Sequence, residues 1–155
     1  MPGVQKPLSW LTPSISELVD LPKAVRREFG YKLSLLQHGD EQESPDIKRF
    51  GEDDRIAHLT KVVFNGADGN TYRLAATVEF EEGIWVIDVF VKKSSSGIST
   101  PQKDIERIVR RLKRLKEFRA SPEGQKIIQE MKAEYAEAVR FKETTEMPGS
   151  KYRRK

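Results

Sequence analysis

The segment from which the fold can be predicted is residues 84–116, IWVIDVFVKKSSSGISTPQKDIERIVRRLKRLK. Its first eight residues are apolar except for Asp88 and rich in β-branched and aromatic types, as is typical of a central strand covered on both faces. Lys92 and Lys93 end the strand, a Ser/Gly linker follows, and Thr100-Pro101 then predicts the N-cap and first position of a helix. A core strand that runs into two lysines predicts a rigid platform with cations at its rim, which suits a phosphate-bearing partner.

The composition predicts one soluble domain. The chain has 155 residues, of which 34% are charged and 37% hydrophobic, so it is long enough to form an ordinary core. It contains no cysteine, which excludes disulfides, thiol nucleophiles and Cys-type zinc sites and makes the cytoplasm the expected compartment. No apolar run approaches the roughly 20 residues that span a bilayer, so we expect no membrane partner and no signal peptide.

The net charge of +4 hides a segregation of charge along the chain. Residues 92–119 contain ten Lys and Arg against three Asp and Glu, whereas residues 40–54 contain two against seven. Such a field favours a polyanion on the basic side and a basic partner on the acidic side. A highly charged, solvated surface would give the same totals, so charge alone leaves both interpretations open.

The N-terminal third predicts a short edge strand at residues 8–11 and a helical hairpin. Ser14 fits a helix N-cap, and Glu17 three residues later would complete a capping box. Pro22 interrupts this helix, and a second helix is predicted to run to about Gln37. Its predicted apolar stripe is Val25, Phe29, Leu33 and Leu36.

The middle of the chain predicts three consecutive strands. Their boundaries follow from turn residues and from the alternation of apolar side chains. The expected order is an acidic loop at 40–55, a strand at 56–64, the turn NGADGN at 65–70, a strand at 72–80 and the strand at 84–91. With the helices, this predicts an α+β fold: a small antiparallel sheet packed by the N-terminal helical hairpin and a C-terminal helix.

Alternation along the strands predicts a polar cluster on the sheet. Lys92 shares a face with Asp88, whereas Lys93 points the other way. If the helices cover the face made by the apolar residues of 72–80, then Arg73 points to an open face, and Asp88, as the polar residue of its strand, should prefer that face too. We therefore predict an open-face cluster of Arg73, Asp88 and Lys92 with Lys93 at its rim. The alternative is that Arg73 and Asp88 form a structural ion pair and the lysines only solvate a strand end.

The helix after Pro101 is amphipathic. Ile105, Ile108, Val109, Leu112 and Leu115 form its core stripe, and the arginines that fall on nearly the opposite side are predicted to be exposed: Arg107, Arg110, Arg111 and Arg114. Ser121-Pro122 predicts one more helix, whose apolar stripe either packs on the domain or forms a partner surface, and the tail at 147–155 adds basic residues.

Other chemistry finds little support in the sequence. His38 and His58 are isolated and do not make a metal site, and there is neither a Gly-rich phosphate loop nor a nucleophile elbow. We therefore expect no metal and no small-molecule cofactor.

Several unlinked motifs resemble a known family. The run FVKKSSSGISTPQKDIERIVRRLK at 90–113, with TYR at 71–73, is similar to the phage-derived branch of the RelE/HigB toxins of type II toxin–antitoxin modules. Members of that branch have a Phe-x-Lys-Lys-Ser run, a Gly-x-x-Thr-Pro step and an amphipathic helix ending in Arg-Leu-Lys. Trp10, Leu21-Pro22 and Phe29-Gly30 match upstream, so the resemblance spans about residues 8–118.

The resemblance implies a RelE-like microbial RNase fold. Residues 1–119 would form the toxin domain, and residues 120–155 a C-terminal helical extension with a basic tail. Proteins of this family enter the ribosomal A site and cut mRNA there, and a cognate antitoxin blocks them. The implied partners are therefore an antitoxin protein, mRNA and the ribosome.

The resemblance also implies roles for the candidate residues. Cleavage proceeds by attack of a ribose 2′-hydroxyl on the adjacent phosphate, which needs a base, cations on the phosphate oxygens and a proton donor. Arg73 would stabilise the phosphate, and Lys92 and Lys93 would bind the backbone, with one of them or Asp88 as candidate base. Arg107, Arg110, Arg111 and Arg114 would contact ribosomal RNA. Relatives often have His where this chain has Asp88 and Glu where it has His58, which leaves the acid–base assignment open.

Two other functions stay open at this point. One is a non-catalytic, ParE-like toxin that keeps the fold and acts by binding a protein. The other is a phage or host regulatory protein that binds nucleic acid through the helix that begins near Thr100.

Overall fold

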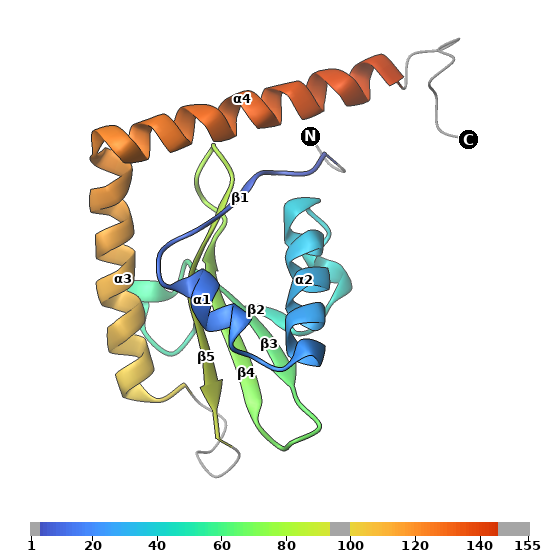
Figure 1. The fold of residues 1–155 in the computed structure, drawn as a ribbon. Coiled ribbons are helices and arrows are strands. Elements are labelled where there is room, and N and C mark those ends of the chain that lie inside the picture. The colour runs from blue at the N-terminus through green and yellow to red at the C-terminus, as the bar shows by residue number, and fades with distance from the viewer. Residues whose placement is uncertain (1–3, 94–99, 146–155) are drawn as a thin grey trace.

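A five-stranded mixed sheet forms the centre of the fold in the computed structural model, which describes residues 4–93 and 100–145 (Figure 1). The strand order is β1-β5-β4-β3-β2. Neighbouring strands are antiparallel except for β1, which pairs with β5 in parallel. The strands are β1 (Leu8–Trp10), β2 (Ile47–Arg49), β3 (Thr60–Asn65), β4 (Thr71–Thr77) and β5 (Ile84–Lys92).

Helices cover both faces of this sheet. In Figure 1, α3 lies along one side and α2 along the other, and α4 crosses the end at which the β4–β5 loop lies. The helices are α1 (Ser14–Val19), α2 (Lys23–Gln37), α3 (Gln102–Ala120) and α4 (Pro122–Thr145), with 3-10 turns η1 (Glu41–Glu43) and η2 (Asp54–Ile56). The predicted α+β fold class, with two N-terminal helices and C-terminal helical packing, is confirmed. The sheet was predicted to be antiparallel, and the parallel pairing of β1 with β5 makes it mixed.

Several boundaries differ from the prediction. β2 lies inside the segment predicted as the acidic loop 40–55. It was not predicted as a strand because three residues are too few to show an alternating pattern. The strand predicted at 56–64 begins only at Thr60, after the turn η2, and the strand predicted at 72–80 ends at Thr77. The Ser/Gly linker at 94–99 and the basic tail at 147–155 lie outside the described residues.

One face of the sheet packs on α2. The α2 residues of this core are those of its predicted apolar stripe, and the β4 residues are those predicted to be covered by helices. β5 contributes three further side chains, with a spacing that skips Ile87 and Asp88. The residues are Val25, Phe29, Leu33 and Leu36 from α2, Tyr72, Leu74 and Ala76 from β4, and Ile84, Val86 and Val89 from β5.

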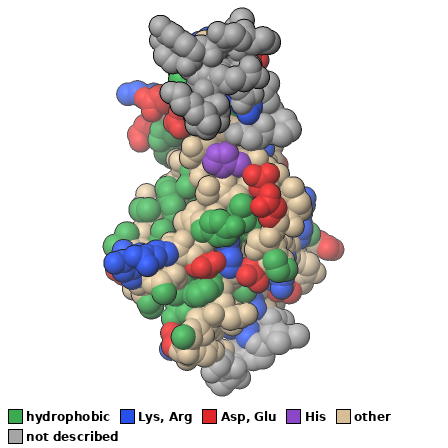
Figure 2. Space-filling view, turned by 90° about the vertical axis from the view of Figure 1, so that its right-hand side faces the viewer, with side chains coloured by type: hydrophobic (Ala, Val, Ile, Leu, Met, Phe, Trp, Pro, Cys, Tyr) green, Lys and Arg blue, Asp and Glu red, His purple; other side chains and the backbone are tan. Residues whose placement is uncertain are grey.

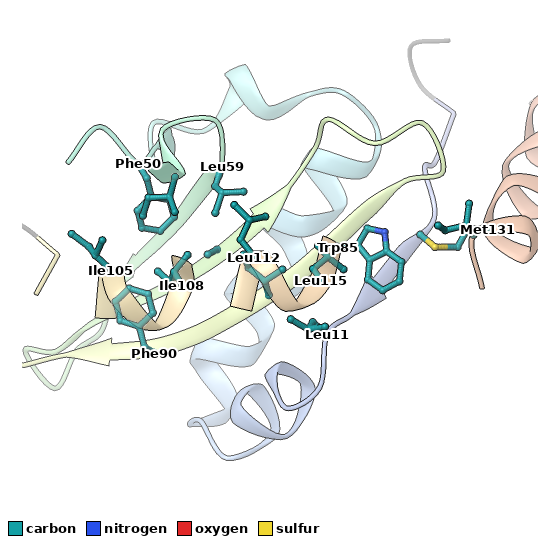
Figure 3. Close-up of a cluster of buried hydrophobic side chains, with 14 residues drawn as sticks. Leu11, Phe50, Leu59, Trp85, Phe90, Ile105, Ile108, Leu112, Leu115 and Met131 are labelled. Carbon is teal, nitrogen blue, oxygen red and sulfur yellow. The ribbon is translucent and has the colours of Figure 1, made fainter. Parts of the chain in front are cut away.

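The other face packs on α3 (Figure 3). The predicted α3 stripe supplies four fully or almost fully buried residues, which meet alternate side chains of β4 and β5. This α3 core contains Ala75, Trp85, Ile87 and Phe90 from the sheet and Ile105, Ile108, Leu112 and Leu115 from α3. Most of the face that was expected to be open is therefore covered.

A bulge in β5 explains the placement of its middle residues. The register passes from Ala75 opposite Asp88 to Ala76 opposite Val86, so Ile87 is an extra residue in β5. Ile87 joins the α3 core and Asp88 bonds to arginines of α3, so two successive side chains turn to the same helix. A strictly alternating strand would send them to opposite faces.

Of the three helices whose predicted start contains a Ser or Thr, only the one that begins after Ser121 has a side-chain cap from that residue. The Ser121 hydroxyl accepts a hydrogen bond from the backbone N–H of Gly124 at 3.0 Å. Ser14 lies inside α1 and donates its hydroxyl to the carbonyl oxygens of Leu11 and Val86, so the capping box does not form. Thr100 does not cap α3 either, because α3 begins at Gln102 and Pro101 is its N-cap residue without a side-chain bond.

The turn between α3 and α4 is tight, and it directs α4 across the end of the molecule. A Cβ at Gly124 would lie 1.8 Å from the carbonyl oxygen of Phe118, so only glycine fits there. The first half of α4 packs through Ile128 and Met131, which belong to the α3 core, whereas Phe141 near its end is 68% exposed. No helix in residues 4–93 and 100–145 is long and apolar enough to cross a membrane.

Candidate functional site

A polar pocket of about 240 Å³ lies on the sheet, on the same face as α3. It is lined mainly by long polar side chains, and four adjacent strands contribute to it. Its residues are Lys48 from β2, Lys61, Val63 and Asn65 from β3, Thr71 and Arg73 from β4, and Lys92 from β5.

The strand register brings these residues together. Lys48 lies opposite Lys61, Val63 opposite Arg73 and Thr71 opposite Lys92. Residues directly opposite each other point to the same face, so a diagonal row of cations crosses the sheet from the end of β5 to the edge strand β2. The predicted association of Arg73 with Lys92 on one face is confirmed, because both line this pocket.

Arg73 bonds to Thr100, which in turn bonds to Glu52. Its side chain is buried, and Nη1 donates to the Thr100 hydroxyl at 2.6 Å. The Thr100 hydroxyl in turn donates to Oε2 of Glu52 at 2.7 Å. Burial lowers the pKa of Arg73, and the nearby charges of Glu52 and Asp104 oppose this shift.

Glu52 also holds Lys61. The Lys61 ammonium lies 2.9 Å from Oε2 of Glu52 and sits 5.1 Å from the centre of the Phe50 ring. Burial acts to raise the pKa of Glu52, but hydrogen bonds from Lys61 and Thr100 outweigh it and lower the pKa to about 2. Glu52 is therefore ionised at neutral pH and neutralises part of the charge at this end of the row.

Lys92 is buried like Lys61 but lacks a carboxylate partner among the described residues. It is 4% exposed, and within residues 4–93 and 100–145 it forms no ion pair. Buried charges in proteins are normally paired, so an ammonium in this position suits a bound anion. Lys48 also forms no ion pair with the described residues but is exposed. Lys93 is exposed beyond the end of β5 and does not line the pocket.

Asp88 does not belong to the pocket, which corrects the predicted open-face cluster. Its side chain is fully buried beneath α3, where Arg107 donates Nε and Nη2 to its two oxygens at 2.8 and 3.0 Å. Arg111 adds a third contact at 3.1 Å. The alternative Arg73–Asp88 pair is wrong as well, because the residue opposite Asp88 on β4 is Ala75. Asp88 is therefore a structural anion with partners from α3.

The four α3 arginines that were predicted to be exposed divide into two pairs. Arg110 and Arg114 are exposed, as predicted. Arg111 is buried, and its guanidinium meets both carboxylate oxygens of Glu17 at 2.7 Å, which corrects its predicted exposure. Arg107 is half-buried between Asp88 and Asp104 and lies 5.5 Å from the Phe90 ring centre. Positions 107 and 111 flank the core stripe, so long side chains there reach acids on the sheet and α1.

The histidines take structural positions. Nδ1 of His38 lies 2.8 Å from the carbonyl oxygen of Ser34 at the C-terminal end of α2, as expected for that position. Nε2 of His58 lies 3.3 Å from Glu79. Among the residues that the structure describes, no group of three or more His, Asp or Glu could hold a metal ion.

Sequence reasoning missed four residues around the pocket: Lys48, Glu52, Lys61 and Thr100. Lys61 had a usable signal, because it alternates with the apolar side chains of Val62 and Phe64 and so had to face away from α2. Lys48 and Glu52 lay in a segment predicted as a loop. Thr100 was assigned to a helix cap, although its hydroxyl bonds to Arg73 and Glu52.

Fold and pocket together define a small α+β protein with a row of cations across one face of its sheet. The family of phage-derived Gp49-like proteins (DUF891) matches residues 16–113, a segment that holds every residue of the pocket. The chain belongs to this family, which is a RelE/HigB-type toxin family. Membership suggests a toxin of a toxin–antitoxin system, with an antitoxin as its partner.

No curated protein matches the sequence. Among solved structures, the chain is similar to the Escherichia coli toxin RelE, in the free state of a double arginine-to-alanine mutant. That match has 23% sequence identity and a TM-score of 0.45, and it covers 70% of this chain and 98% of the other.

Proposed function

We propose that this protein is the toxin of a type II toxin–antitoxin system and cleaves mRNA on the ribosome, with the pocket as its phosphate-binding site. The observation that carries the proposal is the buried ammonium of Lys92, which shares a pocket with three other cations and has no ion pair among the described residues. Family membership supports the toxin role, and the charge of the pocket supports an RNA phosphate as its ligand.

The pocket residues suit the charge that develops during such a cleavage. When a ribose 2′-oxygen attacks the adjacent phosphorus, negative charge builds on the non-bridging phosphate oxygens before the 5′-oxygen leaves. We propose that Arg73 and Lys92, which line the pocket, contact these oxygens and that Lys48 contacts a neighbouring phosphate. We propose that Lys93 binds the backbone outside the pocket and that exposed Arg110 and Arg114 contact ribosomal RNA through its phosphates.

One observation favours a second function, RNA binding without cleavage. The pocket residues described above include no histidine and no carboxylate, which are common general bases and acids. Asp88, the candidate base on the sheet, is bonded to two arginines beneath α3. A toxin that blocks translation by occupying an RNA site would need the cations but no proton transfer.

The test is induced expression in a bacterial host, with the 5′ ends of cellular mRNAs mapped. Wild type is compared with Lys48→Ala, with Arg73→Ala/Lys92→Ala, and with the control Lys23→Ala/Arg27→Ala, which removes two exposed cations from α2. Circular dichroism establishes that each variant folds. The exposed Lys48 provides a variant whose loss of activity cannot be attributed to unfolding.

We expect growth arrest with new cuts inside open reading frames in wild type and the α2 control, and loss of both in Arg73→Ala/Lys92→Ala. Arrest without new cuts would move the assignment to the non-cleaving toxin. No arrest by a folded wild-type protein would contradict the toxin role and leave a regulatory nucleic-acid-binding protein as the remaining candidate.

A further inference from the structure

A single carboxylate oxygen collects three hydrogen bonds behind the pocket. Oε2 of Glu52 accepts from the Lys61 ammonium at 2.9 Å, from the Thr100 hydroxyl at 2.7 Å and from the Thr100 backbone N–H at 3.2 Å. The Thr100 hydroxyl has its acceptor side occupied by Arg73 Nη1 at 2.6 Å. The result is a continuous chain of hydrogen bonds from Glu52 through Thr100 to Arg73.

We propose that Glu52 and Thr100 are positioning residues that fix the guanidinium of Arg73 for the cleavage reaction. This proposal rests on the proposed function of the pocket. Neither residue lines the pocket, so neither is placed to touch RNA. Their effect on the reaction is exerted through the orientation of Arg73 and the location of Lys61.

The geometry of a guanidinium makes this support effective. Its five N–H donors lie in one plane with fixed angles, so a bond at Nη1 limits the directions in which the other donors point. Ionised Glu52 polarises the Thr100 hydroxyl, which is thereby oriented to accept from Arg73 and not to donate elsewhere. A reacting phosphate then meets donors that are already aligned.

The chain of bonds also joins segments that are distant in sequence. Glu52 follows β2, Arg73 lies on β4, and Thr100 precedes α3. Arg73 is thus braced between the edge of the sheet and the start of the helix that covers it. A change at either end is expected to move Arg73 without removing any residue of the pocket.

Two sets of variants, each with its own control, test the proposal. Thr100→Val removes the bridging hydroxyl and Thr100→Ser keeps it, while Thr77→Val removes a buried hydroxyl on β4 that accepts only from the Trp85 N–H in the described structure. Glu52→Gln removes the charge, and Asp53→Asn makes the same charge change one residue away, where the carboxylate bonds to Arg55. Unfolding curves confirm that each variant is folded under the assay conditions.

Two readouts separate positioning from binding. The first is the single-turnover rate of cleavage of ribosome-bound mRNA. The second is the affinity for a fluorescent single-stranded RNA with 2′-O-methyl riboses, which cannot be cleaved. We expect Thr100→Val to slow cleavage about 10- to 100-fold, the size of effect known for a reacting group displaced by about 1 Å, and Thr100→Ser to restore most of the rate.

Glu52→Gln should show a split between the two readouts. Its cleavage rate should fall about tenfold or more, while its affinity for the uncleavable RNA stays equal or increases, because a negative charge near the pocket is lost. Asp53→Asn and Thr77→Val should cleave within about threefold of wild type. Wild-type cleavage by Thr100→Val, or an equal loss in Asp53→Asn and Glu52→Gln, would overturn the proposal.

Failure of the proposed function is distinguishable from failure of the positioning role. If wild type binds the uncleavable RNA but does not cut mRNA, the endonuclease assignment is wrong. The affinities of the Thr100 variants for the uncleavable RNA then test whether Thr100 positions Arg73. Thr100→Val should then bind about 3- to 10-fold more weakly than Thr100→Ser, because Arg73 is no longer held toward the phosphate. Equal affinities of the two variants would overturn the proposal.

Discussion

Asp88 acquires its role from the tertiary structure and not from its own strand. A carboxylate in an apolar β-strand has to find cations or remain a costly buried charge. Here the cations come from α3, where Arg107 lies 2.8 Å away and Arg111 lies 3.1 Å away. Burial acts to lower the pKa of Arg107, but hydrogen bonds to Asp88 and Asp104 outweigh it and raise the pKa. Asp88 thus ties the middle of β5 to α3.

Replacing Asp88 with Asn should destabilise the fold strongly. The substitution leaves two arginine side chains under α3 without their shared anion, and loss of one partner of a buried ion pair costs about 3–5 kcal/mol. Urea unfolding at neutral pH measures the change. Asp53→Asn is the control, because its partner Arg55 is half exposed, and the midpoint of unfolding should move far less. Similar shifts in both variants would contradict a structural role for Asp88.

Glu52 should make stability depend on pH in the acid range. Its pKa falls from 4.5 in the unfolded chain to about 2 in the folded protein, so the ionised form is favoured by folding. The stabilisation is fully present above pH 4.5 and is lost as the pH falls toward 2. The unfolding free energy of wild type should exceed that of Glu52→Gln by about 1–2 kcal/mol at pH 7, since the partly exposed carboxylate is screened by solvent. Urea unfolding at several pH values should show this difference shrinking below pH 4.5. A difference that is constant down to pH 2.5 or so would show that Glu52 is not the titrating group.

Elements with a clear hydrophobic period could be predicted from the sequence, and elements defined by pairing could not. The stripe of α2 and the core stripe of α3 follow the helical period, and both occupy the cores as expected. β2 has only three residues and exists because its backbone pairs with β3. The bulge at Ile87 depends on the register with β4, which no single strand reveals.

The candidate site, like the fold, could be predicted only in part from the sequence. Arg73 and Lys92 follow from the alternation of side chains along long strands, so their shared face could be expected. Lys48 could not be placed, because β2 was not recognised. The Thr100 hydroxyl had two possible uses in the sequence, a helix cap or a distant partner, and local pattern favours the cap. Only the tertiary structure brings it within hydrogen-bond distance of both Glu52 and Arg73.

The first half of α4 should contribute to stability and the second half should not. Ile128 and Met131 are buried in the α3 core, whereas Phe141 is 68% exposed. Ile128→Ala and Met131→Ala should each lower the unfolding free energy by about 2–4 kcal/mol, the usual cost of truncating a buried aliphatic side chain. Phe141→Ala should change it by less than about 0.5 kcal/mol. Chemical denaturation of the full chain measures all three, and equal effects would mean that α4 packs along its whole length.

The effects of these three substitutions would also show where the folded domain ends. We predicted residues 1–119 as the domain and 120–155 as an extension, and the burial of Ile128 and Met131 places the first turns of α4 in contact with the sheet core. We propose that a truncation meant to remove the extension should keep residues up to about 134, because removal of the buried turns would expose Trp85 and its neighbours.

Across the whole molecule, many charges of the acidic segment 40–54 and of the basic segment 92–119 are neutralised by partners elsewhere in the chain. Acids of the segment 40–54 bond to cations of the same chain, as in the pairs Asp46–Lys32 and Glu52–Lys61. On the face shown in Figure 2, acidic and basic side chains of the described residues are interspersed with hydrophobic ones. The pocket differs because Lys48 and Lys92 have no carboxylate partner among the described residues, so these two cations remain available to an external polyanion.

The salt dependence of RNA binding should therefore report the pocket. Each phosphate neutralised on a single strand contributes about −0.7 to the slope of log K against log salt concentration. Because Glu52 already neutralises Lys61, we expect Lys48, Arg73 and Lys92 to account for a slope of about −2. Fluorescence anisotropy with a 2′-O-methyl RNA between low and physiological salt measures it.

Lys48→Ala should reduce the magnitude of this slope by about 0.7, because an exposed side chain that contacts one phosphate is lost. Lys23→Ala removes an exposed cation from α2, on the opposite face of the sheet, and should leave the slope unchanged. If both variants reduce the slope equally, the protein binds RNA through its overall positive charge, and the row of cations across the sheet is not the site. If only Lys48→Ala does so, the site extends from β5 to the edge strand and takes more than one phosphate of the RNA.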